Sequence, residues 1–184
     1  RDKALSPDPC APYDKLRKGL NLGEAAACII MTSDTKCATL SYGSILSGAI
    51  HNDANHISGP SRTGEGSYRC LCDVMGDKEA LAFLNVHGTA TPYNDEMEAI
   101  AINRAGLQDI PINTLKGYYG HTLGAAGLLE TIISIHALHR GVIIGTKGYN
   151  EQGTTQAVSI SAETRHTDKK EFIKLLSGFG GCIS

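Results

Sequence analysis

The sequence predicts an α/β fold, and two observations lead to it. Apolar runs of strand length alternate along the chain with two long helical segments, the pattern that is typical of parallel sheets covered by helices. Three stretches, 86–95, 116–127 and 177–181, end or interrupt apolar segments with abrupt polar or glycine-rich turns. With 184 residues and 41% hydrophobic residues, the chain can build one globular core.

The first third of the chain should contain a loop and two strands. Residues 1–19 are polar and contain three prolines, which predicts a loop. Residues 20–32 form a run of small and apolar side chains, which predicts a buried strand. Residues 38–50 predict a second strand, bent or bulged at its two glycines.

The middle third should contain a helix, a strand and a second helix. Residues 66–75 predict a short helix, and residues 81–88 predict a buried strand that ends at a histidine and a glycine. Residues 94–106 predict a good helix. Asp95 and Glu98 have the spacing of a capping box and suit the positive end of the helix dipole.

The last third should begin with a short strand, followed by the longest helix. Residues 111–117 predict an extended segment, and residues 122–141 predict a helix with an apolar face. Residues 141–146 should be extended, and strands are expected within 156–164 and 171–181. No repeat of fixed short period interrupts this order of elements.

Composition argues against several classes of protein. The formal net charge of -2 gives no electrostatic basis for binding nucleic acid, and no apolar run is long enough to cross a membrane. No signal peptide opens the sequence. The six cysteines are irregularly spaced, which predicts reduced thiols and a cytoplasmic protein.

Two histidines follow predicted strands and are the main candidates for chemistry. His87 ends the strand at 81–88, and His121 precedes a helix that begins with very small residues. Two neutral imidazoles aimed at one carbonyl oxygen can stabilise an oxyanion, and a helix amino terminus favours negative charge. A buried histidine is also a common structural residue, so both interpretations stay open. His136 and His139 lie three apart, but no carboxylate at a matching offset supports a metal site.

Four motifs together resemble the β-ketoacyl synthases of the thiolase superfamily. "NVHGTATPYND" (85–95) is similar to the first histidine motif of that family. "KGYYGHTLGAAGLLE" (116–130) is similar to the lysine and second histidine motif, with the same five-residue step from lysine to histidine. "SGFGG" (177–181) resembles the glycine-rich loop, and "YDKLRKGLNLGEAA" (13–26) resembles the segment that follows the nucleophile.

The resemblance implies one half of a thiolase-type αβαβα sandwich with a mixed, largely parallel sheet. Residues 1–184 would be the carboxy-terminal half of a ketosynthase, with 1–19 as a residual linker from a missing amino-terminal half. The nucleophilic cysteine of the family lies upstream of the segment at 13–26. Cys10 is followed by Ala11 and Pro12 and does not match that motif, so the chain alone is expected to be inactive.

The resemblance also implies a reaction and a role for each site residue. The reaction is the decarboxylative condensation of malonyl-acyl carrier protein with an acyl thioester. His87 and His121 would hydrogen-bond the thioester carbonyl, while Lys116 and Glu130 would orient the histidines. The substrate-binding residues would be Thr89 and Thr91 for pantetheine, and Phe179 and Gly180 at the acyl pocket. Cys182 and Ser177 depart from the family, which usually has threonine and an aromatic residue at these places.

The implied partners are an acyl carrier protein, the missing amino-terminal half and a second copy in a homodimer. The resemblance implies no redox cofactor and no metal, because the substrates travel on the phosphopantetheine of the carrier protein. The alternative is a non-catalytic partner subunit, similar to a chain-length factor, that uses the same fold as a scaffold. The presence of both histidines and of Lys116 favours the enzyme. The motifs do not indicate the acyl length, or whether the pathway makes a fatty acid or a polyketide.

Overall fold

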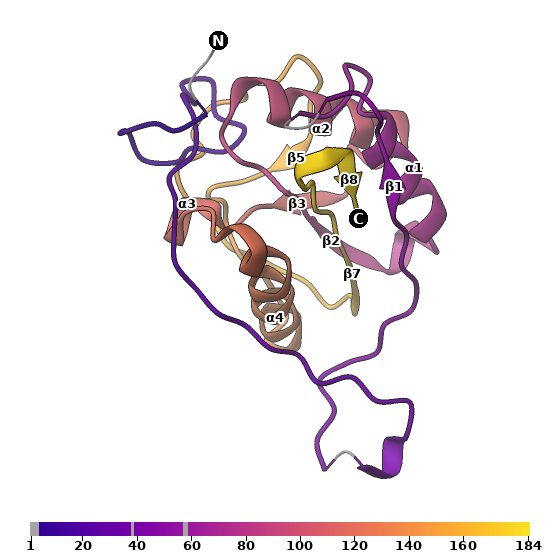
Figure 1. The fold of residues 1–184 in the computed structure, drawn as a ribbon. Coiled ribbons are helices and arrows are strands. Elements are labelled where there is room, and N and C mark those ends of the chain that lie inside the picture. The colour runs from indigo at the N-terminus through magenta and orange to yellow at the C-terminus, as the bar shows by residue number, and fades with distance from the viewer. Residues whose placement is uncertain (1–3, 38, 57–58) are drawn as a thin grey trace.

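A four-stranded parallel sheet forms the centre of the molecule (Figure 1). The computed structural model describes residues 4–37, 39–56 and 59–184. The strands are β2 (Leu81–Asn85), β3 (Pro111–Asn113), β5 (Ser159–Ile160) and β7 (Glu171–Lys174). Their order is β5-β3-β2-β7, and every neighbouring pair is parallel. The α/β class and the largely parallel sheet are confirmed.

Helices cover both faces of this sheet, as Figure 1 shows. Helices α1 (Glu65–Val74) and α2 (Pro92–Arg104) pack together on one face, and α4 (Ala126–His139) covers the other, next to β2 and β7. Alternation along β2 explains the two layers. Leu84 joins a core with residues of α1 and α2, whereas Phe83 joins a separate cluster that contains Leu138 of α4.

Shorter elements complete the fold. Strands β1 (His51–Asn52) and β8 (Cys182–Ile183) pair antiparallel, as do β4 (Val142–Ile143) and β6 (Arg165–His166). The remaining helical turns are α3 (Lys116–Tyr119), η1 (Thr35–Cys37), η2 (Lys78–Ala80), η3 (Leu123–Ala125) and η4 (Phe179–Gly181). Among the helices of the described residues, none is long and apolar enough to cross a membrane.

The helix predictions hold with shifted ends. The helix expected at 66–75 is α1, and the helix expected at 94–106 is α2, which starts two residues earlier because Pro92 occupies its first turn after Thr91. The strand expected at 111–117 ends at Asn113, and Lys116 begins the short helix α3. The helix expected at 122–141 is proper only from Ala126, after the turn η3.

The two strands expected at 20–32 and 38–50 are wrong. Apart from η1, the described part of residues 24–50, which we call the apolar arm, has no regular structure, and Ala38 lies outside the described residues. Ile30 is 91% exposed and Ile45 is 75% exposed. The arm runs away from the sheet in a wide excursion (Figure 1). An apolar run forms a buried strand only where it can pair with a neighbouring strand and pack beneath a covering layer. The arm does neither at the central sheet.

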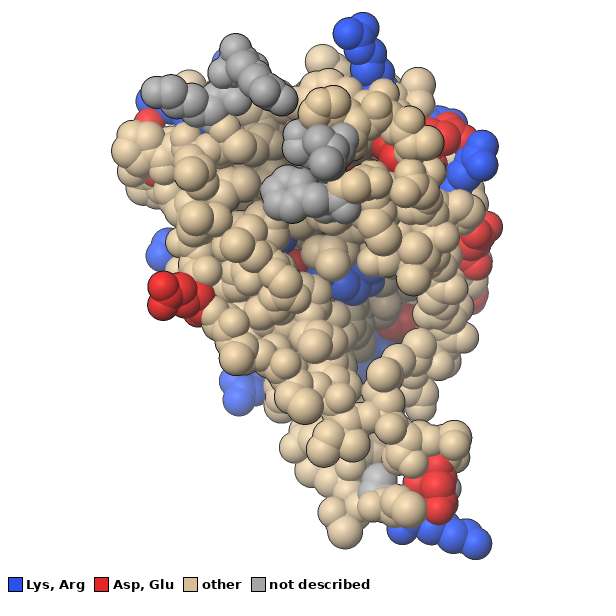
Figure 2. Space-filling model, viewed as in Figure 1, with Lys and Arg blue, Asp and Glu red and all other residues tan. Residues whose placement is uncertain are grey.

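Charged side chains of both signs are scattered over the face seen in Figure 2, which shows no continuous patch of one sign there. Most of the charged groups that bear on the site described next are buried instead.

Candidate active site

The rings of His87 and His121 lie close together, as expected from the sequence. Their centroids are 5.1 Å apart, and the ring planes meet at 81° in an edge-to-face arrangement. His87 follows the carboxyl end of β2, whereas His121 sits between α3 and η3, ahead of the long helix. His87 is buried and His121 is half-buried. The predicted approach of the two histidines is confirmed; their chemical roles stay predictions.

Both imidazoles are neutral at pH 7. Burial, followed by the positive charges of Lys116 and Lys174, lowers the pKa of His87 well below its ordinary value. Burial and the same lysines lower the pKa of His121 to about 4, with Glu130 acting in the opposite direction. A neutral imidazole has one nitrogen that donates and one that accepts, so each ring can give one hydrogen bond.

The backbone sets which nitrogen of His121 carries the proton. The amide N–H of Leu123 donates to Nδ1 of His121 over 3.2 Å, so Nδ1 is the acceptor and Nε2 carries the hydrogen. Nδ1 of His87 is buried and has no hydrogen-bond partner among the described residues. The His121 ring therefore keeps an N–H that can be given to a ligand oxygen.

Lys116 holds the backbone of His87. Its Nζ donates to the carbonyl oxygen of His87 over 2.5 Å and to Oε1 of Glu130 over 2.7 Å. Both charged side chains are fully buried. Burial raises the pKa of Glu130, but the ammonium groups of Lys174 and Lys116 together hold it below the ordinary value, so the carboxylate is ionised. Lys116 thus fixes the position of His87 through the main chain and not through the ring.

Glu98 fixes the turn that carries His87. The amide N–H groups of His87 and Gly88 donate to its two carboxyl oxygens over 2.7 and 2.9 Å. The hydroxyl of Tyr13 donates to the same carboxyl group over 2.8 Å. The predicted capping box of Asp95 and Glu98 is therefore wrong. Thr91 is the N-cap residue of α2, so both acidic residues lie within the helix, and their buried carboxyl groups accept from amides of the turn after β2.

Asp95 completes this turn and sets the place of Thr89. Its carboxyl group accepts from the amide of Thr89 over 3.0 Å and from the amide of Tyr13 over 2.8 Å. Burial raises the pKa of Asp95 to about 7. The hydroxyls of Thr89 and Thr91 share a hydrogen bond of 2.8 Å, so the structure brings this predicted pair together.

The segment before the apolar arm clamps the backbone of His121. Leu22 forms a parallel bridge with His121, and the amide of Gly23 donates to the carbonyl oxygen of His121 over 3.1 Å. A Cβ on Gly23 would lie 1.9 Å from the carbonyl oxygen of Tyr119, closer than atoms can approach. Gly120 has a φ of 79°, and a Cβ there would lie 2.8 Å from the backbone of Leu22. The small residues around His121 let these chains meet.

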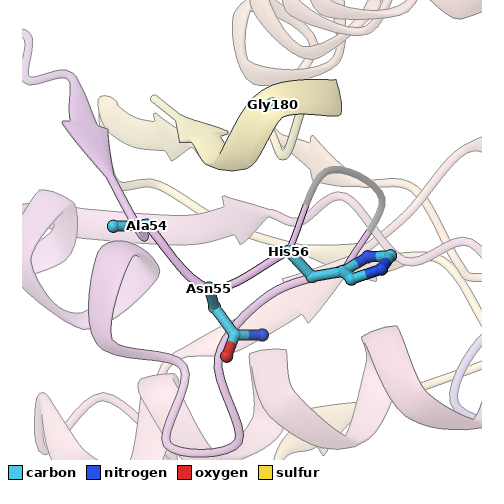
Figure 3. Close-up of a pocket in the computed structure, with 4 residues that line it drawn as sticks. All are labelled: Ala54, Asn55, His56 and Gly180. Atoms are coloured by element: carbon cyan, nitrogen blue, oxygen red, sulfur yellow. The ribbon is translucent and has the colours of Figure 1, made fainter.

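Gly180 lines a hollow that the histidine pair does not line. The hollow, of about 320 Å³, is lined by Ala54, Asn55, His56 and Gly180 (Figure 3). Neither His87 nor His121 lines it. Gly180 is exposed, with a φ of 84° in the turn η4, and the side chain of Phe179 lies outside the described residues. The substrate-binding roles of both residues stay predictions.

Cys10 has the properties of a structural thiol. It is buried, and its Sγ lies 3.8 Å from the carbonyl oxygen of Thr89. Burial raises the pKa of Cys10 to about 11, so the reactive thiolate form is rare at neutral pH. This fits the sequence interpretation that Cys10 does not match a nucleophile motif.

His136 and His139 contact the arm. The ring of Tyr42 lies 5.4 Å from that of His136 and 6.2 Å from that of His139. Nε2 of His139 is 2.6 Å from the carbonyl oxygen of Tyr42. These contacts hold one point of the arm against α4.

Lys174 is a residue of the site that the sequence analysis missed. Its side chain is only 12% exposed, and its Nζ lies 2.5 Å from Oε2 of Glu130. The available signal was a lysine between Ile173 and Leu175 in a predicted core strand, where parallel strands are usually apolar throughout.

Comparisons with known proteins agree with this geometry. Residues 42–150 match the family described as "Beta-ketoacyl synthase, C-terminal domain". The chain is 36% identical over 158 residues to nodulation protein E of Rhizobium meliloti, covering 81% of this chain and 39% of that protein. It is 32% identical over 182 residues to the chloroplastic 3-oxoacyl-[acyl-carrier-protein] synthase I of Arabidopsis thaliana, covering 92% of this chain and 38% of that one.

A solved structure extends the similarity to the fold. The ishigamide ketosynthase/chain length factor structure superposes with a TM-score of 0.82 at 26% sequence identity, covering 98% of this chain and 47% of that one. The chain thus spans about two fifths of the length of the curated relatives described above.

Proposed function

Because the chain belongs to the β-ketoacyl synthase family and contains its C-terminal domain, we propose that it is the C-terminal portion of a 3-oxoacyl-[acyl-carrier-protein] synthase. The proposed reaction is the decarboxylative Claisen condensation of malonyl-acyl carrier protein with an acyl thioester. The observation that carries the proposal is the pair of neutral histidine rings, 5.1 Å apart, beside the buried Lys116–Glu130 ion pair.

In this mechanism the histidines stabilise the charge that decarboxylation creates. When the carboxylate of the malonyl group leaves as carbon dioxide, its bonding electrons form an enolate whose oxygen is the former thioester carbonyl. Neutral N–H donors from His87 and His121 would face that oxygen, and the proton on Nε2 of His121 supports such a role. The carbanion then attacks the acyl thioester and expels the thiolate. The electrons come from the substrate, so the step needs no redox cofactor.

Lys116 and Glu130 act in this proposal as positioning residues. Lys116 donates to the carbonyl oxygen of His87, and Glu130 holds Lys116 from the first turns of α4. Buried charges that are paired on every side hold their neighbours within a narrow range of positions. The proposed role of both residues is to keep the His87 ring opposite His121.

The remaining parts of the proposal concern the rest of the protein. The acyl-accepting cysteine would belong to an amino-terminal half, as the family resemblance implies, and that half would cover the apolar arm. The name of the Arabidopsis relative supports an acyl carrier protein as the substrate carrier. Its pantetheine would meet Thr89 and Thr91, with Phe179 and Gly180 at the acyl pocket. We also propose a homodimer in the cytoplasm.

A chain-length-factor-like subunit is the second candidate. The structure that superposes with a TM-score of 0.82 is named for both a ketosynthase and a chain length factor. A scaffold subunit does not need two converging neutral histidines, and this chain has them. The histidine pair therefore favours the enzyme.

The test compares two half-reactions in the full-length protein. His121→Ala should slow carbon dioxide release from malonyl-acyl carrier protein by about a hundred- to a thousandfold, the usual loss for one oxyanion donor. Acyl loading, followed in single turnovers, should change little. His136→Ala, which removes a histidine from the outside of the site, is the matched control. Equal losses in both half-reactions for His121→Ala would identify a structural histidine instead.

Residues 1–184 alone provide a further check. Without the proposed amino-terminal half they should not convert malonyl-acyl carrier protein and an acyl donor to a 3-oxoacyl product. Formation of that product, followed by mass spectrometry, would overturn this part of the proposal.

A further inference from the structure

Lys174 faces the candidate site from the last position of β7. It lies in register with Asn85 of β2, two residues before His87. Alternation along β7 places Lys174 on the same side of the sheet as Phe172, which stacks on Phe83 beneath α4. β7 and β2 are parallel neighbours, so their carboxyl ends lie at the same edge of the sheet, and His87 follows the end of β2 at that edge.

Lys174 shares one carboxylate with Lys116. Nζ of Lys174 lies 2.5 Å from Oε2 of Glu130, while Nζ of Lys116 lies 2.7 Å from Oε1. Lys174 also donates to the carbonyl oxygen of Leu175 over 3.0 Å. Two ammonium groups and one carboxylate leave this buried cluster with one positive charge in excess. A Lys116–Glu130 pair without Lys174 would be neutral.

We propose that Lys174 is a third positioning residue, which gives the cluster behind His87 and His121 a net charge of +1. A fixed positive charge near two imidazoles disfavours their protonation and keeps them as neutral donors. The same charge favours any negative charge that develops on an oxygen between the rings. The second effect rests on the proposed condensation, whereas the first does not.

The charges around Lys174 fit this role. Lys116 of α3 and Glu130 of α4 face it from the helix side, and Glu98 of α2 adds a weaker attraction. Lys174 and Lys116 both lower the pKa values of His87 and His121. Burial lowers the pKa of Lys174 itself to about 8, despite the attraction of Glu130. The excess charge is therefore present at pH 7 and is lost as the pH rises through about 8.

A purely structural Lys174 would only fill space and pair with Glu130. Histidine titration separates this alternative from the proposal. In the full chain, NMR of ring-labelled histidine should place the midpoint of His121 at about 4. Lys174→Met, which keeps an unbranched side chain one atom shorter and removes its charge, should raise that midpoint by about one unit. Lys174→Arg, which keeps the charge, should move it by less than about 0.3 units.

An unchanged midpoint in a folded Lys174→Met chain would overturn the proposal. A second measurement needs no substitution: the ε-carbon resonance of Lys174 in the wild-type chain should titrate near pH 8. A midpoint at or above the ordinary value of 10.5 would mean that the side chain of Lys174 is not buried in solution, and would also overturn the proposal.

Activity distinguishes the two proposals. In the full-length protein, Lys174→Met should lower carbon dioxide release roughly tenfold, and Lys174→Arg should restore most of it. If the midpoint of His121 shifts as expected but the wild-type protein releases no carbon dioxide, the charge role of Lys174 is supported and the proposed condensation fails. If release is normal in Lys174→Met and the midpoint is unchanged, the condensation stands and the role of Lys174 fails.

Discussion

Strand β2 and the apolar arm both contain apolar runs, but these runs have opposite surroundings. Residues 81–85 of β2 are fully buried between β3 and β7, with helices on both faces. The arm residues around Ile30 and Ile45 are equally apolar and largely exposed. A hydrophobic sequence therefore indicates that burial of the segment would be favourable. Whether the segment is buried depends on the strands and helices that lie next to it. The candidate site belongs to the covered region, which can hold buried charges in fixed positions.

The largest expected difference between the two regions is in how much a substitution lowers the free energy of unfolding. Phe83→Ala should lower the free energy of unfolding by about 4 kcal/mol, because it removes a buried aromatic ring and leaves a cavity. Ile45→Ala should change it by less than about 0.5 kcal/mol. Urea denaturation of the chain measures both. A loss above about 2 kcal/mol for Ile45→Ala would show that the arm is packed in solution, contrary to its exposure in the structure.

The buried ion pair and an exposed one offer a second contrast. Glu130→Gln should cost about 3 kcal/mol, because two buried ammonium groups lose their counter-charge. Glu151→Gln removes the partner of Lys15 in a pair whose side chains are 60% and 68% exposed, and should cost less than about 0.5 kcal/mol. The same denaturation experiment applies. Equal costs would mean that water reaches the Glu130 cluster.

Thiol alkylation compares the two regions without substitutions. Cys28 and Cys37 of the arm are exposed, whereas Cys10 is buried with a pKa of about 11. Iodoacetamide at pH 8 should modify Cys10 at least about a hundredfold more slowly than the two arm cysteines. Peptide mass spectrometry gives each rate. Similar rates for Cys10 and Cys28 would contradict the burial of the segment around Cys10.

The smallest predicted effect concerns the free energy of unfolding that is lost by burying the charge of Lys174. Its folded-state pKa of about 8 lies below the ordinary value of 10.5, so between these values the unfolded chain binds more protons than the folded chain. The destabilisation of the fold by this group therefore shrinks as the pH rises from about 8 to 10.5. Lys174→Met should raise the free energy of unfolding at pH 7 by about 2 kcal/mol, and the gain should vanish above about pH 10.5.

Lys174→Arg is the control for this stability effect. Arginine keeps its charge across the whole range, so it should show neither the gain nor its pH dependence. A Lys174→Met chain that is less stable than wild type at pH 7 would show that pairing with Glu130 outweighs the cost of burial.

The sequence was sufficient for much of the site because its chemistry is local. His87 follows a strand that reads as buried, and the step from Lys116 to His121 spans one short helical turn. The approach of the two rings could be inferred because parallel strands end at one edge of a sheet. The roles of Asp95 and Glu98 could not, because capping residues and carboxylates that bind a distant turn have the same local spacing.

The arm and Lys174 show where local reasoning ends. The run around Ile30 fits a strand in every local respect, and only the position of the other strands leaves it uncovered. Lys174 looks like an interruption in an apolar strand until Glu130, 44 positions earlier, is seen beside it. In both cases the deciding contacts join residues that are far apart in the chain.

The close approach of chains at Gly23 and Gly120 has a consequence for how this protein can evolve. Any side chain on Gly23 would strike the carbonyl of Tyr119, and any side chain on Gly120 would strike the backbone of Leu22. Single substitutions at either position displace the main chain that carries His121, and no neighbouring side chain can yield to absorb the change. At Gly43 and Gly48, by contrast, a Cβ would meet nothing within 4 Å. Substitutions of the arm glycines should therefore be nearly neutral in evolution, whereas almost every substitution of the glycines beside His121 should be harmful.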